Sequence, residues 1–268
     1  MSCNKIVDLM CGPIKNLEDL FCWQVPELSW AENVINLKSK TFFSYAGKDW
    51  SCKDVPPTNV SKYYSESVPK TLLCHDMKGG YLNDRFVNGA ASCDDYKFIH
   101  WSGIDIFVYF SHEFITVPPL AWINAGHRHG VPVLGTLITE GKQGEDLWET
   151  VLSSEEKVQS LISKMNAVCN HYRFDVIWYD SVTHPEGKLD WQNELNFLNR
   201  AFFEACDGIY LNYGWNEDKL RASISRAGAR VTDVFVGVDV FGRGCYGGGE
   251  FNSVVVRSLC HYTFQNRG

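Results

Sequence analysis

The sequence predicts an α/β protein of the TIM-barrel, or (β/α)8, type in which the barrel is incomplete. Short apolar runs alternate with helical segments at a spacing of roughly 30 residues, which is typical of βα units and a parallel sheet. Acidic residues recur where predicted strands end, at Asp76, Glu140, Asp180 and Asp239. In a (β/α)8 barrel these carboxyl ends converge on one mouth, where the active site is built.

The predicted elements follow one another regularly from residue 70 onward. Strands are expected at residues 71–76, 104–110, 132–140, 176–180, 209–213 and 234–239. Helices are expected at residues 118–129, 153–171, 191–206 and 217–227, and the second of these keeps its apolar residues on one face. About six of the eight strands of a complete barrel are therefore present.

We expect three parts along the chain. Residues 1–70 form an irregular N-terminal segment with a short helical stretch at residues 14–20. Residues 71–250 form the (β/α) barrel domain of catalytic type, and residues 251–268 form a divergent C-terminal tail. The chain ends before an eighth strand is evident.

Composition limits the partners and the compartment. The formal net charge of -7 argues against a nucleic-acid partner, because such surfaces are basic. No apolar run approaches the ~18 residues that span a bilayer, and the N-terminus lacks a secretory pattern, so no membrane partner is expected. The ten cysteines are scattered without a C-x-x-C pair, which favours free thiols in a reducing cytosol.

The residue types at the predicted barrel mouth favour carbohydrate chemistry. There is no G-x-G-x-x-G or Walker-type loop after any strand, so nucleotide binding has little support. Nine tryptophans accompany the carboxylates, and exposed aromatic rings are common platforms for sugars, although core packing also explains many of them. Any single acid can instead cap the helix that follows it. His127 and His129 point away from each other on one helix, and we expect neither a metal nor another cofactor.

Several long segments resemble the cytosolic endo-β-N-acetylglucosaminidases of glycoside hydrolase family 85. They run in family order from about residue 42 to 250, and they include His100-Trp101, Gly135-Thr136-Leu137-Ile138-Thr139-Glu140, Trp178-Tyr179-Asp180-Ser181, Asn212-Tyr213-Gly214-Trp215 and Gly237-Val238-Asp239-Val240-Phe241-Gly242. The resemblance implies cleavage of the GlcNAc-β1,4-GlcNAc core bond of N-glycans, on glycoproteins or free oligosaccharides.

The resemblance also implies a substrate-assisted mechanism. The 2-acetamido oxygen of the substrate attacks its own anomeric carbon and forms an oxazolinium intermediate. An Asn orients that amide, and a Glu two residues later protonates the leaving oxygen and then activates water. The protein mainly orients groups, because the nucleophile belongs to the substrate.

This chain departs from the family at one internal position. The family's Asn-x-Glu ends a strand that follows a phrase like Arg173-Phe174-Asp175, and a helix then leads to the strand that begins near Val176. Here Asp175 is joined directly to Val176, so the strand-helix unit that carries both residues is expected to be absent. Glu140 and Asp180 are the available candidates to replace the acid, and both would need a raised pKa and correct placement over the scissile oxygen. We therefore predict a chain with little or no activity.

The remaining site residues are assigned by resemblance. Tyr179 is expected to contact the acetamido group and help position the oxazolinium. The expected substrate contacts are Trp101, Glu140, Asp180, Trp191, Asn212, Trp215 and Asp239. Three alternatives stay open: a hydrolase seen as a shortened splice form or incomplete gene model, a non-catalytic glycan-binding paralogue, and an unstable fragment.

Overall fold

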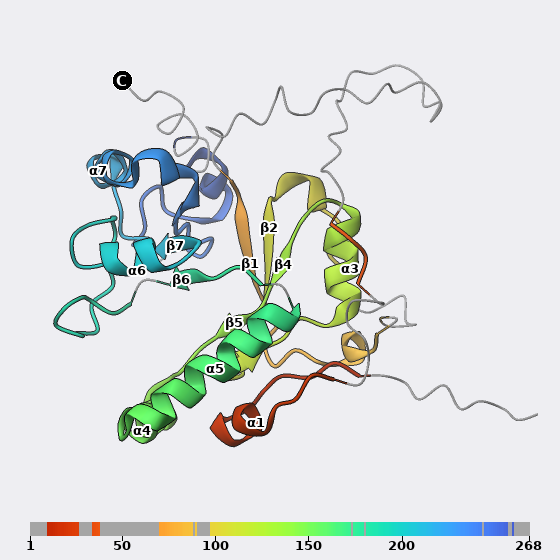
Figure 1. Cartoon of the computed structure of the whole chain (residues 1–268). Coiled ribbons are helices and arrows are strands. Elements are labelled where there is room, and N and C mark those ends of the chain that lie inside the picture. Colours follow the sequence, from red (N-terminus) through yellow and green to blue (C-terminus); the bar gives the residue numbers. More distant parts are fainter. Residues whose placement is uncertain are drawn as a thin grey trace, which may run out of the picture. The chain divides into compact units, whose positions relative to one another are not determined.

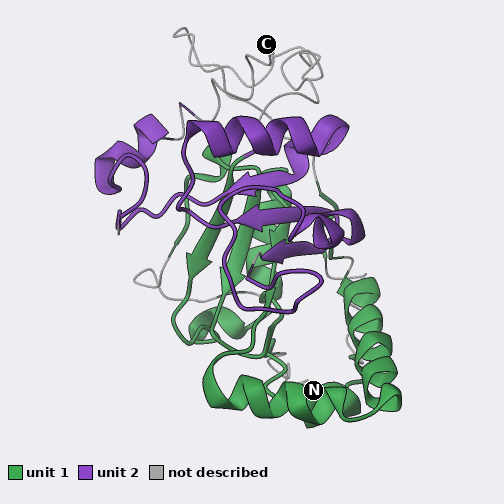
Figure 2. Cartoon of the chain, turned by 90° about the vertical axis from the view of Figure 1, so that its left-hand side faces the viewer, with its two compact units in different colours: residues 1–47, 71–174 green, residues 48–70, 175–268 purple. Residues whose placement is uncertain are grey.

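The computed structural model describes residues 10–26, 34–37, 70–87, 89, 97–172, 174–179, 181–242, 244–256 and 259. The chain divides into two compact units, which Figure 2 shows in different colours. Unit 1 comprises residues 1–47 and 71–174, and unit 2 comprises residues 48–70 and 175–268. The boundary at residues 174 and 175 lies where a segment is predicted to be missing.

The main sheet of unit 1 has three parallel strands in the order β1-β2-β4, labelled in Figure 1. They are β1 (Leu72–Asp76), β2 (Ile106–Phe110) and β4 (Val133–Leu134). The helix α3 (Leu120–Arg128) packs near β4 so closely that a Cβ at Gly126 would meet the Val133 side chain and the Val131 carbonyl. A core of aromatic and branched residues fills this side of the unit: Trp101, Ile104, Phe107, Tyr109, Trp122, Ile123, Val131 and Val133.

A second part of unit 1 is built on a short antiparallel pair. The strand β3 (Ile115–Thr116) pairs with β5 (Thr136–Leu137), and α1 (Leu17–Cys22), α4 (Gly141–Leu152) and α5 (Glu155–Tyr172) complete this part. Its core consists of Ile14, Leu20, Phe114, Ile115, Val117, Val151, Leu161 and Val168. Short 3-10 turns, η2 (Asn83–Arg85) and η3 (Trp101–Gly103), lie between β1 and β2 in the chain.

Unit 2 has its own parallel sheet in the order β6-β7-β8. The strands are β6 (Ile177–Tyr179), β7 (Gly208–Leu211) and β8 (Val234–Val236). The helices α6 (Arg200–Ala205) and α7 (Glu217–Ala227) and the 3-10 segments η4 (Gly228–Asp233) and η5 (Glu250–Asn252) accompany this sheet. The core gathers Leu195, Phe203, Ile209, Leu211, Trp215, Leu220, Ala227, Val231, Val234 and Val256.

All six predicted strand regions contain strands, and the mixed α/β class is confirmed. The closed barrel is not found: the described residues form three separate sheets, one of them antiparallel, rather than a single ring of strands. The predicted strand at residues 132–140 is divided into β4 and β5 at Gly135, where a Cβ would overlap the carbonyl of Thr116. The close passage of the Thr116 backbone thus interrupts what reads as one apolar run. The predicted domain boundaries near residues 70 and 250 stay predictions.

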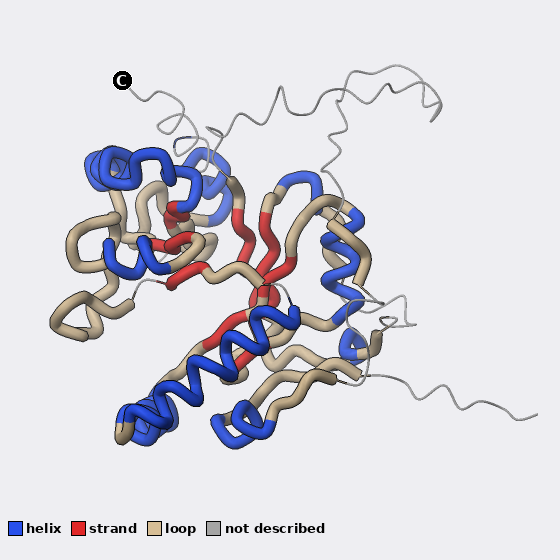
Figure 3. The backbone as a smooth tube through the Cα atoms, in the orientation of Figure 1, coloured by secondary structure: helices blue, strands red, loops and turns tan. Residues whose placement is uncertain are grey.

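One helix prediction was wrong in part, and one helix was missed. The helix expected at residues 191–206 begins only at Arg200, and the stretch before it is loop (Figure 3). The helix α4 was not predicted, although α5 occupies nearly the expected range. By contrast, α7 has the predicted bounds.

Six of the ten cysteines lie in the described part of the chain, and all six are free thiols: Cys11, Cys22, Cys74, Cys169, Cys206 and Cys245. Among the described residues, no helix combines the length and the apolar character that crossing a membrane requires.

Candidate functional site

At the carboxyl end of the unit 1 strands, one histidine lies between two carboxylates. Asp76 is the last residue of β1, and its Oδ2 lies 3.1 Å from Nε2 of His112, which follows β2. The other ring nitrogen of His112, Nδ1, is 4.0 Å from Oε2 of Glu140. The backbone of His112 has φ of 60°, a left-handed conformation that is uncommon for a residue with a side chain. Asp76 and Glu140, the two acids predicted at this edge, therefore both lie close to His112. The sequence did not predict this histidine as a site residue.

The hydrogen bonds of Asp76 favour its charged form. Partial burial raises the pKa of its carboxyl, but the Lys78 backbone N–H, which donates to Oδ1 at 2.7 Å, and the contact with His112 outweigh that effect and lower the pKa. Glu140 occupies the N-cap position of α4, yet its side chain makes no capping hydrogen bond and is 69% exposed. The side chain therefore does not cap the helix, although the Glu140 carbonyl accepts a hydrogen bond from the Gly144 backbone N–H.

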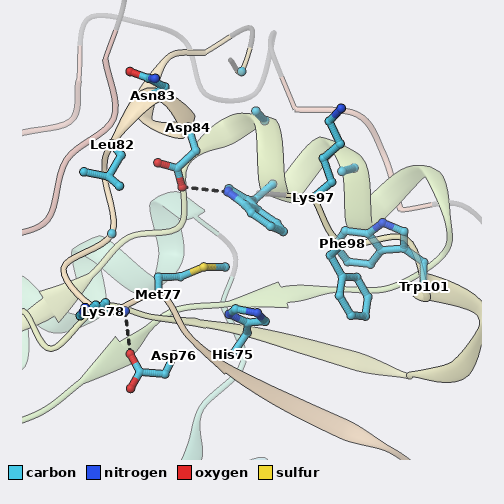
Figure 4. Close-up of a pocket in the computed structure, with 15 residues that line it drawn as sticks. His75, Asp76, Met77, Lys78, Leu82, Asn83, Asp84, Lys97, Phe98 and Trp101 are labelled. Atoms are coloured by element: carbon cyan, nitrogen blue, oxygen red, sulfur yellow. Dashed lines mark hydrogen bonds between the residues drawn. The ribbon is translucent and has the colours of Figure 1, made fainter. Parts of the chain in front are cut away.

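A pocket of about 500 Å3 opens beside the end of β1 (Figure 4). Its lining includes Phe98, Trp101 and Trp122 together with the carboxylate of Asp84. Oδ2 of Asp84 accepts hydrogen bonds from Nε1 of Trp122 at 3.0 Å and from the hydroxyl of Tyr109 at 2.8 Å. Burial raises the pKa of Tyr109, so this phenol keeps its proton and stays a donor to Asp84. The arrangement gives the pocket aromatic walls and one firmly oriented acid.

Trp101, a predicted substrate contact, is largely a core residue. It is 4% exposed, and its ring lies parallel to that of His129 at a centroid distance of 6.0 Å. Phe98 meets it edge-on at 4.9 Å. Only the part of Trp101 that lines the pocket is available to a ligand.

In unit 2, Tyr179, Asn212 and Asp239 follow or end neighbouring strands at the same edge of the sheet. Tyr179 ends β6, Asn212 directly follows β7, and Asp239 lies shortly after β8. Because the three strands are parallel, their carboxyl ends face the same way. Tyr179 is 52% exposed, and its ring is stacked on Tyr210 with centroids 5.3 Å apart. This ring is therefore held in place while one side remains open to a ligand.

The polar side chains at this edge are fixed by hydrogen bonds. Nδ2 of Asn212 donates to Oδ1 of Asn193 at 3.0 Å, and the same oxygen accepts from the Gly214 backbone N–H at 2.7 Å. Asp239 is 9% exposed, and its Oδ1 accepts from the Phe241 backbone N–H at 3.0 Å. Asn193 was missed as a site residue, although it lies within the segment of family resemblance around Trp191.

The two predicted tryptophan walls of unit 2 differ in accessibility. Trp191 is 44% exposed in the loop after β6, whereas Trp215 is only 3% exposed. Nε1 of Trp215 donates to the Gly237 carbonyl at 2.7 Å, and the ring of Tyr246 covers it at a centroid distance of 5.3 Å. Tyr246 was not predicted, because it stands in a glycine-rich run that carries no chemical motif of its own.

The predicted site residues thus fall into two groups. Unit 1 holds Trp101 and Glu140, and unit 2 holds Tyr179, Trp191, Asn212, Trp215 and Asp239. Asp180 lies outside the described residues. Within unit 2 the sheet edge offers an exposed phenol, oriented amides and a carboxylate, a combination suited to the hydroxyl and amide groups of a neutral sugar.

Comparison with known proteins gives the same family for both units. The sequence model of Glycosyl hydrolase family 85 matches residues 81–176 and 175–265. The cytosolic endo-beta-N-acetylglucosaminidase of Gallus gallus is 46% identical over 223 residues, covering 69% of this chain and 30% of the relative. The human enzyme of the same name is 38% identical over 278 residues, covering 90% of this chain and 35% of the relative. No solved structure matches the chain.

Each alignment extends over more positions than the number of residues of this chain that it covers. The human alignment extends over 278 residues, whereas 90% of the 268-residue chain is about 241 residues, which leaves about 37 positions without a counterpart here. For the Gallus gallus relative, 223 aligned residues against 69% of the chain, about 185 residues, leave about 38. The chain spans about a third of the length of these relatives. Because the family match covers well over half of the sequence, the chain belongs to glycosyl hydrolase family 85.

Proposed function

We propose that this chain is a shortened form of a cytosolic mannosyl-glycoprotein endo-β-N-acetylglucosaminidase that has lost its catalytic strand-helix unit. The parent activity is hydrolysis of the GlcNAc-β1,4-GlcNAc core bond of N-glycans. The observation that carries the proposal is the coincidence of two breaks at one junction. The family match stops and restarts at residues 175 and 176. Along the sequence, the boundary between the two compact units falls between residues 174 and 175.

The size of the gap supports a loss of one whole unit. About 37 residues is the length of one strand with its helix and connections, because a βαβ motif takes roughly 30 residues or more. The two match segments overlap at residues 175 and 176, so nothing in this chain fills the interval. We infer that the Asn that orients the acetamido group and the Glu that acts as acid and base both belong to this interval.

The substrate-assisted reaction requires the Asn and the Glu that we assign to the missing interval. Attack by the 2-acetamido oxygen needs the amide to be oriented, and departure of the leaving sugar needs a proton from a general acid. Loss of a general acid alone costs about 10²–10⁴-fold in rate. Glu140 is mostly exposed and pairs with His112, and no described contact holds it in the manner of a buried acid. The proposal is therefore that this chain does not release glycans at a useful rate.

What the chain keeps is suited to holding a glycan. Tyr179 and Asn212 lie at one sheet edge of unit 2, and Trp191 lies in the loop after β6. The exposed rings of Tyr179 and Trp191 are accessible to sugar faces. The proposed ligands are N-glycans on glycoproteins or as free oligosaccharides, and the proposed compartment is the cytosol. The relatives carry the word cytosolic in their names.

A chimaera tests the proposal directly. The segment that the human relative carries at this junction is inserted between Asp175 and Val176, and release of high-mannose glycans from a glycoprotein is measured by mass spectrometry. We expect release by the chimaera and none by the chain as it stands. The matched control carries the same insert with its Glu changed to Gln, which keeps the length and removes the acid.

Robust glycan release by the unmodified chain would contradict the proposal. A chimaera that folds but stays inactive, with its Asn-x-Glu intact, would equally argue against it. Sequencing of full-length transcripts across the codons for Asp175 and Val176 separates a splice form, in which most transcripts carry the insert, from a true paralogue, in which none do.

The second candidate function is glycan binding without turnover. It is favoured by the preserved aromatic and amide groups at the sheet edge of unit 2, which include the half-exposed Tyr179 stacked on Tyr210. Calorimetric titration with a high-mannose glycan that has an intact chitobiose core tests it. Saturable binding without any hydrolysis product is the expected result.

A further inference from the structure

The chain after β8 folds into a loop that is closed at its base. The Glu250 backbone N–H donates to the Val240 carbonyl, and Gly242 lies directly against Gly249, where a Cβ would overlap the neighbouring backbone. Gly247, Gly248 and Gly249 all have φ between 73° and 81°, in the left-handed region that glycine enters without strain. These glycines let the chain reverse sharply, so the residue before them, Tyr246, lies at the turn.

Tyr246 is held there by two contacts. Its ring is stacked on Trp215 at a centroid distance of 5.3 Å and an interplanar angle of 26°. Its hydroxyl donates to Oε1 of Glu217, the first residue of α7, at 2.9 Å, and this hydrogen bond raises the pKa of Tyr246. Trp215 is in turn anchored to the Gly237 carbonyl, so the support beneath the Tyr246 ring is rigid.

Accessibility decides which of the two rings a ligand can reach. Trp215 is 3% exposed, whereas Tyr246 is 38% exposed. A pyranose therefore cannot stack on Trp215 while Tyr246 covers it, whereas Tyr246 keeps an exposed surface that a ligand can reach. Of the two carboxylate oxygens of Glu217, only Oε1 takes part in a hydrogen bond among the described residues. Oε2 can therefore accept hydrogen bonds from the hydroxyl groups of a ligand.

We propose that Tyr246 and Glu217 form a sugar subsite that has not been assigned to this protein. A neutral pyranose stacks on the outer face of Tyr246 and donates hydroxyl hydrogen bonds to Glu217, while Trp215 supports the ring from behind. The carboxylate selects against acidic sugars, because a sialic acid would place a second negative charge beside it. This inference rests on the proposed glycan binding and adds the residues that carry part of it.

Titration calorimetry on the full chain with a neutral high-mannose glycan tests the subsite. We expect Tyr246→Ala to weaken binding by roughly tenfold, in line with the loss of one aromatic stacking contact. Tyr246→Phe keeps the ring and loses the hydroxyl, so a smaller loss of about twofold to threefold is expected. Phe241→Ala is the matched control: this ring is on the same loop and 83% exposed, and its removal leaves the affinity unchanged.

The outcomes separate this inference from the proposed function. Binding by the wild type that Tyr246→Ala leaves intact overturns the subsite and leaves glycan binding standing. Absence of binding by the folded wild type overturns both. Circular dichroism of each variant reports folding, and if Tyr246→Ala does not fold, Glu217→Gln decides: an affinity equal to the wild type refutes the contact. A sialylated glycan that binds as tightly as the neutral one contradicts the proposed selectivity.

Discussion

The carboxylate of Asp76 ends β1, where a backbone N–H and a histidine ring both contact it. Lys78 donates to Oδ1, and His112 lies against Oδ2. Both contacts favour the charged form over the opposing effect of partial burial, so the pKa of Asp76 is lower in the folded protein than its ordinary value of 3.8. At the scale of a residue, this makes part of the stability of unit 1 depend on pH.

The sign of that dependence follows from the lowered pKa. The stabilisation is complete above the unfolded-state pKa and is lost as the pH falls through the folded-state value. We expect Asp76→Asn to be less stable than the wild type at neutral pH by no more than about 1 kcal/mol, because the side chain is 61% exposed and water screens the pair. The difference should vanish once the pH falls below the lowered folded-state pKa of Asp76.

Urea denaturation at several pH values measures this difference. Glu186→Gln serves as the control, since Glu186 is exposed and has no hydrogen bond or ion pair in the described part of the chain. A destabilisation by Asp76→Asn that is the same at neutral and acid pH would show that the carboxylate charge is not responsible.

At the scale of an element, caps decide where helices begin and end. The helix α7 starts after Asn216, whose Oδ1 accepts from the Lys219 backbone N–H at 3.0 Å, and it stops at Gly228, whose φ is 58°. The helix expected at residues 191–206 starts late because asparagines compete for its backbone. Oδ1 of Asn199 accepts from the Asn196 N–H at 2.7 Å, and Oδ1 of Asn196 accepts from the Leu198 N–H at 2.9 Å.

The cap of α7 gives the second prediction. Replacing Asn216 by Ala removes the acceptor for the Lys219 N–H and should lower the free energy of unfolding by about 1 kcal/mol. Asn216→Asp keeps an acceptor at the same position and should stay near the wild type. Thermal and urea unfolding of the three proteins provide the comparison, and equal stabilities for all three would mean that the cap contributes nothing.

At the scale of the whole molecule, the proposed function depends on the junction at Asp175. Each unit keeps a parallel sheet and a core of its own, and each brings part of the predicted site to the carboxyl ends of its strands. Tyr179 stands four residues after the junction, so a restored strand-helix unit would precede it directly in the chain. Its proposed role in positioning the oxazolinium depends on the catalytic residues that we propose this chain has lost.

The third prediction therefore uses the chimaera with the restored segment. Changing Tyr179 to Phe there removes a hydroxyl placed to stabilise the charged intermediate, and we expect kcat to fall by roughly a hundredfold, as for loss of one well-placed donor. Tyr210→Phe, which keeps the ring stacked beneath Tyr179, is the matched control and should have a small effect. Equal rates for Tyr179→Phe and the parent chimaera would remove Tyr179 from the mechanism.

The sequence by itself determined six strand regions, most of the helices and the family, and it predicts the position of the break. The apolar runs identify six strand regions and miss β3, since the alternation of side chains along a strand and their 3.6-residue repeat along a helix are local properties of the backbone. The sequence did not determine whether the strands close into a barrel or which side chains are exposed to solvent. Trp215 and Tyr246 are both aromatic, yet only the second faces solvent. Tertiary structure decides such questions, because burial and strand pairing depend on residues that lie far apart in the chain.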